Sequence, residues 1–472
     1  MSARPPSGGR VAPPRSGHDL AGRTVGVYGS GGAPWHHLAL AASFGADVVP
    51  VRAEDVAAGR LADLDALIVP GGGAIAMAGL LAPLGETGAE AIAAWVRGGG
   101  TYVASCAGSV LPLALRDAAD EALPLARCLR MVDVPMANEG DATLGGLASP
   151  GVGRIRVRLD PTHPFTAGLP SEIDVVHYNG PLFDLSKTPA GVRPFAWPVA
   201  ATEAFTPAER FLPGGSGGAT TFDRCVAAGA ATGLEADVGD GHLLLFGSHP
   251  EFGLGPLLLG WSDAAALLIA ALASVPGRAA GRATWGARRT HPERAPGHLA
   301  AGAADALERA AARFDALTTD VPEPWLTAEH AAAFHGRTAR SAWPEDAAAA
   351  ARVAHAAARD LAALAPSLDA DDAAWLDDAP RPDQDFGWMG LTQLLERVHA
   401  MLDAAESAPA APDAPPAHAY DLFDHHPFHL AVGSYLSAAG LISAAALTVI
   451  VLAARHDAPT PALAPIVGPT PA

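Results

Sequence analysis

The sequence predicts an α/β domain, with a parallel sheet covered by helices on both faces, followed by an α-helical domain. Short continuous apolar runs alternate with helical patterns through the first part of the chain, as is typical of buried parallel strands. At 472 residues the chain is longer than one hydrophobic core usually supports. Its last third has alanine-rich stretches with apolar residues at three- and four-residue spacing, which indicates packed helices.

The strands can be assigned in chain order. A β-branched run in RTVGVYGSGG, the helix-like WHHLALAASFG and a second run, ADVVPV, make a β-α-β opening. DLDALIVPGGG adds a strand that stops at three glycines, AEAIAAWVRGGG a helix, and TYVASC the next strand. After Leu113 the clear strand candidates are RIRVRLDP, DVVHYNGPLF and GHLLLFGSHPEFG. Functional residues are expected where these strands end, because ligands bind at the carboxyl edge of such sheets.

Composition divides the chain into five segments. Residues 1–21 are rich in Pro, Gly, Ser and Arg without an apolar core, which predicts a disordered leader and no secretory signal. Residues 22–275 form the predicted α/β domain, and 276–298, without periodicity, the linker. Residues 299–456 form the helical domain with an apolar last helix, and 457–472 a disordered tail.

The run from Leu430 to Ala454 has two interpretations. It lacks charge over a length that can cross a bilayer, so it could anchor the C-terminus in a membrane. However, much of it is Ala, Ser and Gly, and Arg455 is the only nearby basic flank. The central helix of a bundle is also apolar on every side. Both interpretations stay open: residues 430–454 either contact a membrane or lie inside a helical bundle.

Composition also excludes several classes of protein. The net charge of −19 repels nucleic acid and anionic lipid. The only lysine, Lys187, has flanks that match neither a P-loop nor a pyridoxal site. Cys106, Cys128 and Cys225 are widely spaced, which predicts neither a disulfide framework nor a structural zinc site and fits a reducing cytoplasm.

The segment TYVASCAGSV contains the first candidate for chemistry. Cys106 stands between small residues where a strand would turn into a helix, so a tight elbow would expose the thiol and the helix N-terminus would favour the thiolate. The alternative is a small core residue. In FGSHPEFG, His249 and Glu251 supply a base and a carboxylate to orient it, with Pro250 holding the backbone between them. The ends of parallel strands would bring Cys106 and His249 to one edge.

These motifs resemble a known superfamily. SCAG and HPE, with VPGG before them, resemble the flavodoxin-like sandwich of class I glutamine amidotransferase-like proteins, whose members carry a Cys-His-Glu triad. More narrowly, VPGGG, GGGTYVASCAG, HYNGPLF and FGSHPEFG resemble in order the biotin-protein ligase N-terminal domain, over about residues 22–260. The resemblance implies that Cys106 is the nucleophile, that His249 is the general base and then acid, and that Glu251 holds His249.

The resemblance also implies a backbone site for the developing oxyanion. Its donors would be the N–H of Ala107 and one near Gly72, since negative charge on a tetrahedral intermediate needs preorganised donors. The neighbouring Gly71 and Gly73 would let the backbone approach a substrate closely. No metal or organic cofactor is required by such a site.

The segment HYNGPLF is a second candidate for the substrate pocket. The polar groups of Tyr178 and Asn179, with His177 beside them, could face the substrate. The alternative is a plain turn at Asn179-Gly180-Pro181.

The expected activity is hydrolysis or transfer at an amide through a thioester intermediate. A small-molecule amide or a peptide-like compound would be the substrate. No biotin-binding or ATP-binding motif follows residue 275, so a biotin ligase is not expected. No synthetase domain is visible, so an amidotransferase would need a partner synthetase in trans. The alternative is a non-catalytic module for small-molecule binding or regulation, which the apolar run could anchor in a membrane.

Two further groups of histidines are candidate ligands. His36 and His37 follow the first Gly-rich loop and are expected to be solvated or capping residues. The segment DHHPFH has imidazoles at a spacing that can bind zinc, but Pro427 interrupts the turn. A polar lead-in to the apolar helix is therefore preferred for Asp424, His425, His426 and His429.

Overall fold

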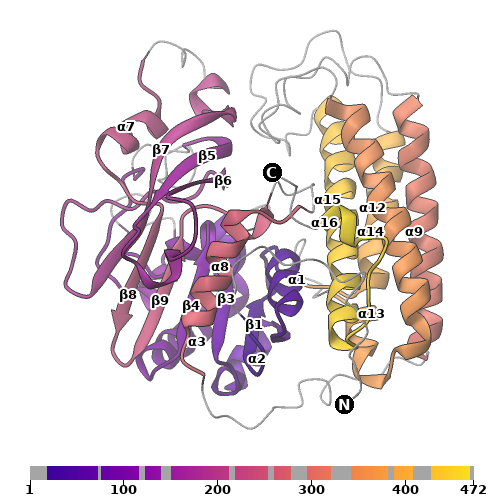
Figure 1. Cartoon of the computed structure of the whole chain (residues 1–472), viewed down its shortest axis with the longest axis horizontal. Helices are drawn as coiled ribbons and strands as arrows, with labels where there is room; N and C mark the ends of the chain where they lie inside the picture. Colours follow the sequence, from indigo (N-terminus) through magenta and orange to yellow (C-terminus); the bar gives the residue numbers. More distant parts are fainter. Residues whose placement is uncertain are drawn as a thin grey trace.

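The structure, a computed structural model, contains an α/β domain beside a bundle of long helices (Figure 1). The predicted fold class, an α/β sandwich followed by a helical domain, is confirmed. The residues that the structure describes are 19–72, 76–115, 123–139, 150–211, 218–253, 260–277, 295–319, 342–380, 387–407 and 427–467.

The described part of the α/β domain is built on one nine-stranded sheet in the order β2-β1-β3-β4-β9-β8-β7-β5-β6. Parallel pairing joins β2, β1, β3, β4 and β9, which is the doubly wound order of flavodoxin-like sheets. Antiparallel pairing continues through β8, β7, β5 and β6. The strands are β1 Thr24–Tyr28, β2 Asp47–Val51, β3 Ala66–Val69, β4 Thr101–Ser105, β5 Val152–Leu159, β6 Glu172–Tyr178, β7 Val192–Thr206, β8 Gly233–Val238 and β9 Gly241–Phe246.

The prediction of a parallel sheet is therefore right only for one half of it. Buried and exposed residues alternate along β5, with Arg154, Arg156 and Arg158 exposed, as is typical of antiparallel strands with one solvated face. The sequence does not predict β7 and β8, because they lack long apolar runs. The segment inserted between the two parallel strands β4 and β9 extends the sheet sideways.

Helices cover both faces of the parallel strands. Alternate residues point to opposite sides, so Val103 joins one apolar cluster with α1 and α8, and Tyr102 joins another with α3 and α6. The helices of this domain are α1 Trp35–Ser43, α2 Ala53–Ala57, α3 Ala76–Arg97, α4 Ala107–Val110, α6 Ala126–Leu129, α7 Thr221–Ala227 and α8 Asp263–Ser274. Short 3-10 turns are η1 Arg60–Asp63, η3 Pro164–Thr166, η4 Ala208–Phe211 and η5 Pro250–Phe252.

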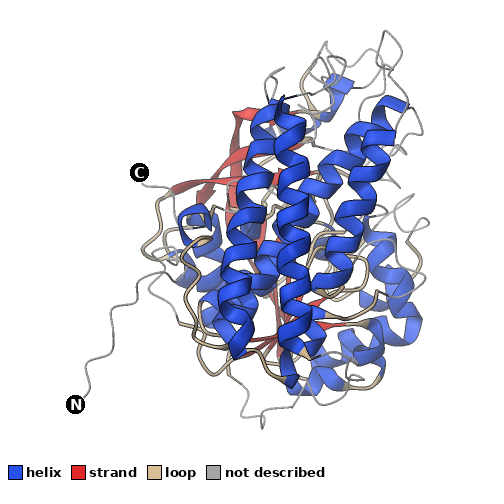
Figure 2. Cartoon of the chain, turned by 90° about the vertical axis from the view of Figure 1, so that its right-hand side faces the viewer, coloured by secondary structure: helices blue, strands red, loops and turns tan. Residues whose placement is uncertain are grey.

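The helical domain packs against the α1 side of the sheet. Figure 2 shows its helices in front of the strands. Buried residues of α1, α8 and the bundle belong to one apolar cluster, so a continuous core joins the two domains. Its helices are α9 Pro296–Thr319, α12 Ala342–Leu364, α13 Ala373–Leu376, α14 Leu391–Ser407, α15 Pro427–Arg455 and α16 Ala464–Val467, with turns η7 Ala365–Ser367 and η8 Ala370–Asp372.

The long apolar run forms α15. Among the described residues, Ala438–Arg455 is the one helical window long and apolar enough to cross a membrane, with a mean hydropathy of 1.9. In the folded chain 83% of that window is buried. Core helices of soluble bundles share this burial, so length and composition alone are weak support for an anchor.

The end of the chain differs from its prediction. The predicted disordered tail begins at residue 457, yet α16 lies within it, and Leu463 and Val467 are fully buried. The Asp360 carboxylate accepts hydrogen bonds from the amides of Ala462 and Leu463 at 3.1 and 2.9 Å. That prediction is wrong up to Val467, because these contacts come from a distant helix. The predicted leader, apart from residues 19–21, and most of the predicted linker lie outside the described residues.

Candidate active site

Cys106 occupies a sharp turn between β4 and α4. Its backbone angles are φ 49° and ψ −119°, a region that residues with a Cβ rarely adopt and that stores about 1–3 kcal/mol of strain. The Cys106 N–H donates to the carbonyl of Phe246 at 2.9 Å, which ties the turn to β9. A Cβ on Gly108 would lie 2.8 Å from the Pro70 carbonyl, so the turn needs glycine there. These contacts hold a partly exposed thiol just past the carboxyl end of β4.

The helix after Cys106 is shorter than the sequence suggests. α4 has four residues, a single turn, so its amides sum to only a small dipole. The expected support of a thiolate by a helix N-terminus is therefore weak. A thiolate at Cys106 would have to be stabilised mainly by the side chains that face it.

His249 and Glu251 follow β9, the strand that lies next to β4 in the sheet. His249 Nδ1 is 2.7 Å from Glu251 Oε1, and the two residues are 4% and 1% exposed. The ring of Phe252 stacks on the imidazole at 4.3 Å between centroids and 4° between planes. These contacts fix the ring, with Nε2 on the side away from the carboxylate.

Nε2 of His249 faces Cys106. A Cβ on Gly71 would lie 3.4 Å from His249 Nε2 and also 3.4 Å from Cys106 Cβ, so both groups line the same small space. Cys106 is near enough to His249 to raise the pKa of the imidazole. The structure thus brings together the three residues predicted as catalytic.

Electrostatic attraction outweighs burial in setting the protonation of His249 and Glu251. Burial lowers the pKa of His249, but the Cys106 thiolate and the Glu251 carboxylate outweigh it and raise that pKa from 6.5 to about 10. Burial raises the pKa of Glu251, but the imidazoles of His37 and His249 outweigh it and lower that pKa from 4.5 to about 2. His249 is therefore an imidazolium at neutral pH.

The loop after β3 brings its backbone close to this cluster. A Cβ on Gly71 would lie 2.5 Å from His249 Cε1, so a larger residue there would displace the ring. Gly72 forms an isolated antiparallel bridge with Gly32, and the Ala33 N–H donates to the Gly71 carbonyl at 3.2 Å. In a bridge of this kind the hydrogen bonds come from the flanking residues, so the Gly72 N–H takes no part in the pairing. Gly73 lies outside the described residues.

Ala107, the other predicted oxyanion donor, is the first residue of α4 and is buried. Its loop follows β4, and the Gly72 loop follows β3, which pairs with β4 in parallel. The two predicted donors therefore lie on neighbouring loops at the same edge of the sheet.

The segment after β6 forms a wall beside the thiol. The Cys106 thiol donates to the Tyr178 carbonyl at 3.3 Å, and the Tyr178 ring stands edge-on to His249 at 6.4 Å. Asn179 has a positive φ of 53°, as in a tight turn. A Cβ on Gly180 would lie 3.5 Å from Cys106 Cα. The segment is thus a turn, as one interpretation of the sequence has it, and also a neighbour of Cys106.

The neighbouring His177 is a buried residue of β6. It is 0% exposed, and its Nδ1 lies 3.1 Å from Ser248 Oγ, which in turn lies 2.9 Å from Thr232 Oγ1. Burial, with the nearby charge of His249, lowers the pKa of His177 to about 3. His177 is therefore neutral, and its contact with Ser248 supports the segment that leads into His249.

His36 and His37 contradict the prediction of solvated residues. They are 6% and 1% exposed, in the first turn of α1. His37 Nε2 lies 3.6 Å from Glu251 Oε2 and 3.4 Å from Ser105 Oγ. Ser105 Oγ donates to Glu251 Oε1 at 3.0 Å. The sequence analysis gave His37 another role and did not single out Ser105, although Ser105 ends the parallel strand β4 and His37 lies in the helix that follows β1.

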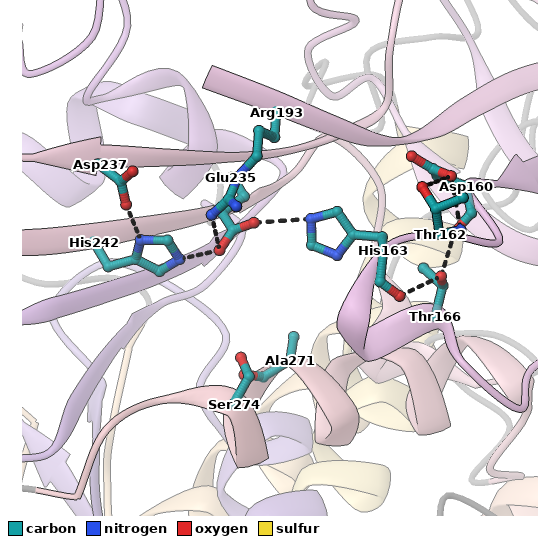
Figure 3. Close-up of polar contacts among 10 residues, drawn as sticks. All are labelled: Asp160, Thr162, His163, Thr166, Arg193, Glu235, Asp237, His242, Ala271 and Ser274. Carbon is teal, nitrogen blue, oxygen red and sulfur yellow. Dashed lines mark hydrogen bonds and ion pairs between the residues drawn. The ribbon is translucent and has the colours of Figure 1, made fainter. Parts of the chain in front are cut away.

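A second polar cluster lies elsewhere on the sheet (Figure 3). Glu235 on β8 lies 2.8 Å from His163 Nε2, 2.6 Å from His242 Nε2 and 3.0 Å from an Arg193 nitrogen. Burial raises the pKa of Glu235, but bonds to His163 and His242 outweigh it and lower that pKa to about 2. His242 pairs with the first residue of β4, Thr101, so this cluster is at the opposite end of the strands from Cys106.

Two groups of described side chains have atoms close enough to hold a metal ion. Both lie outside the site around Cys106. In one of them the Asp372 carboxylate already pairs with Arg455 at 2.9 Å and with His456 at 2.6 Å. The groups are Glu86, Glu90 and Cys128, and Asp369, Asp372 and His456. Residues 424–426 of the DHHPFH segment lie outside the described residues, as does the side chain of His429.

No family model and no curated protein matches the chain. Solved structures match it at low identity, and three of them are described here. A candidate GMP synthase component from Thermoplasma acidophilum is 15% identical, with a TM-score of 0.32, over 53% of this chain and 94% of that one. A ThuA-like protein from Bacteroides uniformis is 10% identical, with a TM-score of 0.32, over 56% and 96%. A cytoplasmic protein from Salmonella typhimurium is 13% identical, with a TM-score of 0.32, over 54% and 100%. Matches at this level assign neither a family nor an activity to the chain.

Proposed function

We propose that the protein is a cysteine-dependent hydrolase or acyl transferase that acts on an amide through a thioester. One observation carries the proposal: Cys106, on a strained turn, faces an imidazole whose other nitrogen is bonded to Glu251 at 2.7 Å. A nucleophile, a base and an orienting carboxylate in this order form the general arrangement for acyl transfer. The sequence resemblance to class I glutamine amidotransferase-like proteins supports the same chemistry.

In the proposed reaction the Cys106 thiolate attacks the amide carbon and forms a C–S bond. The carbonyl oxygen becomes an oxyanion, and the N–H groups of Ala107 and Gly72 would stabilise it. The C–N bond breaks as His249 Nε2 gives its proton to the leaving amine. A water then gives a proton to His249 and attacks the thioester, which releases a carboxylic acid and the Cys106 thiolate. An amine acceptor in place of water would complete an acyl transfer.

The substrate class follows from the same chemistry. A small-molecule amide or a peptide-like compound has the carbonyl and the leaving amine that the mechanism needs. If the released amine is ammonia, a partner synthetase in trans would consume it. The proposal does not extend to biotin ligation.

A non-catalytic binding or regulatory module is the second candidate. It is favoured by the hydrogen bond from the Cys106 thiol to the Tyr178 carbonyl at 3.3 Å, because this bond requires the protonated thiol, which is a weaker nucleophile than the thiolate. A thiol engaged in this way is less available to a substrate. The two candidates differ in whether the thiol reacts faster than an ordinary one.

The test is iodoacetamide alkylation from pH 5 to 10, with each cysteine followed by mass spectrometry. We expect Cys106 to react at least about tenfold faster at pH 7 than Cys128, and to lose this advantage in His249→Ala. A panel of primary and secondary amides then tests turnover, with Cys106→Ala as the inactive variant and Cys128→Ala as the matched control. Ordinary reactivity of Cys106 that is independent of His249 would favour the binding module.

A further inference from the structure

The two oxygens of Glu251 have different environments. Oε1 is 2.7 Å from His249 Nδ1 and accepts from Ser105 Oγ at 3.0 Å. Oε2 is buried and has no hydrogen-bond partner among the described residues. Leaving a buried carboxylate oxygen without a donor is costly, because its hydration is lost without replacement. A nitrogen that can come into hydrogen-bond range of Oε2 is therefore significant.

His37 supplies such a nitrogen. Its Nε2 lies 3.6 Å from Glu251 Oε2 and 3.4 Å from Ser105 Oγ, and the residue is 1% exposed. The hydroxyl of Ser105 gives its proton to Glu251, so its lone pairs can accept from His37. A proton on His37 Nε2 therefore points to Glu251 either directly or through Ser105.

The other nitrogen of the ring supports this tautomer. His37 Nδ1 is buried and has no hydrogen-bond partner among the described residues. A buried N–H without an acceptor is rarer in proteins than a buried acceptor without a donor. The proton is thus better held on Nε2, where it has acceptors, than on Nδ1.

The charged and titratable groups around Glu251 favour a neutral His37. Burial lowers the pKa of His37, and the nearby charge of His249 lowers it further, although Glu251 opposes them. Cys106 follows β4, His36 shares α1, and His177 lies on β6; burial also lowers the pKa of His36 and of His177 to about 3. His249 is therefore the imidazolium that faces the Glu251 carboxylate.

We propose that His37 is a positioning residue for this site: its neutral ring donates from Nε2 to the Ser105–Glu251 pair and holds the carboxylate against His249 Nδ1. The inference rests on the proposed function, since it assigns His37 a part in preparing Cys106 for reaction. His37 contacts neither the thiol nor a substrate in this role. Its effect reaches Cys106 through Glu251 and His249.

The position of His37 suits such a role. α1 begins directly after the Gly-rich loop that follows β1, and its apolar residues share one core with α8 and the bundle. The backbone of His37 is therefore held by packing on several sides. A side chain on such a rigid element can orient a carboxylate more precisely than one on a loop.

The experiment compares two substitutions of His37 with one of its neighbour. His37→Leu keeps a buried side chain of similar bulk and removes the donor, whereas His37→Gln keeps an amide nitrogen near the position of Nε2. His36→Leu is the matched control, because His36 is buried on the same turn but contacts the Phe252 ring, at 4.8 Å. The first readout is the pH profile of Cys106 alkylation in the full chain.

We expect His37→Leu to slow alkylation at pH 7 about tenfold, the effect of losing one hydrogen bond to a charged group. The midpoint of the pH profile should rise by about one unit. His37→Gln should restore the rate to within about threefold, and His36→Leu should leave the midpoint unchanged. A purely structural role for His37 would not be rescued by glutamine and would not move the midpoint.

The second readout is the ¹⁵N spectrum of histidine-labelled protein. It reports the tautomer of His37 and the protonation of His249 whether or not the protein turns over a substrate. We expect the Nε2–H tautomer of His37, and a lower pKa of His249 in His37→Leu. The Nδ1–H tautomer, or a wild-type His249 signal in His37→Leu, would overturn the inference.

The two proposals can fail separately. If Cys106 reactivity depends on His249 but is unchanged in a folded His37→Leu, only the role of His37 is wrong. If Cys106 reacts like an ordinary thiol in the wild-type chain, the proposed function fails, and the ¹⁵N spectrum still decides the inference. If His37→Leu does not fold, the wild-type tautomer and the profile of His37→Gln against His36→Leu decide it.

Discussion

His249 Nδ1 lies 2.7 Å from Glu251 Oε1, and burial excludes water from both side chains. The carboxylate helps to hold the pKa of His249 near 10. In Glu251→Gln we therefore expect that pKa to fall and Cys106 alkylation at pH 7 to slow at least about tenfold. A ¹⁵N titration of His249 and alkylation rates measure both effects. Glu203→Gln, at an exposed position of β7, is the control, and an unchanged His249 titration in Glu251→Gln would contradict the prediction.

The same pair should make stability depend on pH. Because the folded pKa of His249, about 10, exceeds its ordinary 6.5, its contribution is complete below pH 6.5 and is lost as pH rises toward 10. Because the folded pKa of Glu251, about 2, is below its ordinary 4.5, its contribution is complete above pH 4.5 and is lost as pH falls toward 2. Both contributions are complete between pH 4.5 and 6.5.

His249→Gln tests this window. We expect it to lower the free energy of unfolding most at pH 6 and progressively less at pH 8 and 10, since the wild-type chain itself loses the imidazolium there. Urea unfolding at the three pH values gives the measurement. Equal destabilisation at all three would show that the charge of His249 contributes nothing to stability.

Gly71→Ala should displace the imidazole of His249. The added Cβ would lie 2.5 Å from His249 Cε1, and the stacked Phe252 ring limits movement of the imidazole. Overpacking of this kind costs about 1–3 kcal/mol of stability. We also expect Cys106 alkylation at pH 7 to slow at least about tenfold, because the imidazole moves from its position beside Cys106. Gly218→Ala is the control, since an added Cβ there would have no neighbour within 4 Å. Wild-type alkylation in Gly71→Ala would contradict the contact.

Glu235→Gln should destabilise the antiparallel half of the sheet. The carboxylate, with 11% of its side chain exposed, pairs with His163, His242 and Arg193, and an amide cannot satisfy all three. We expect a loss of about 2 kcal/mol in the free energy of unfolding, measured with urea at pH 7.

Alkylation of Cys106 should not change in Glu235→Gln. His242 pairs with the first residue of β4 and Cys106 follows its last, so the two sites are roughly 16 Å apart at the rise of a strand. A slower Cys106 in a folded Glu235→Gln would reveal a coupling between the two clusters that their separation does not predict.

The apolar helix α15 allows a direct test of membrane contact. With 83% of the window Ala438–Arg455 buried, the folded chain has little of this surface left for lipid. We expect the full chain to stay at the bottom of a flotation gradient with phosphatidylcholine vesicles. A peptide of residues 427–457 is the control and should float, because its apolar face is uncovered. Flotation of the full chain would favour the anchor.

Much of the candidate site can be predicted from short local segments of the sequence. Small residues around Cys106 predict the elbow, and the HPE segment brings His249 and Glu251 together because only one residue separates them. The strand ends on which they stand follow from continuous apolar runs, whose carboxyl ends meet at one edge of a parallel sheet. Local pattern and a general rule of topology were sufficient for these residues.

The sequence by itself determined the parallel core of the fold, its candidate nucleophile and base, and the helical nature of the last third. Only the tertiary structure decided that His37 and Ser105 face Glu251, that β5 to β8 extend the sheet, and that α16 is ordered. Ser105 and Glu251 are 146 positions apart, so no local pattern links them. Burial of a histidine or of a proline-rich tail depends on which distant surfaces cover it, and that is settled only when helices and sheet pack together.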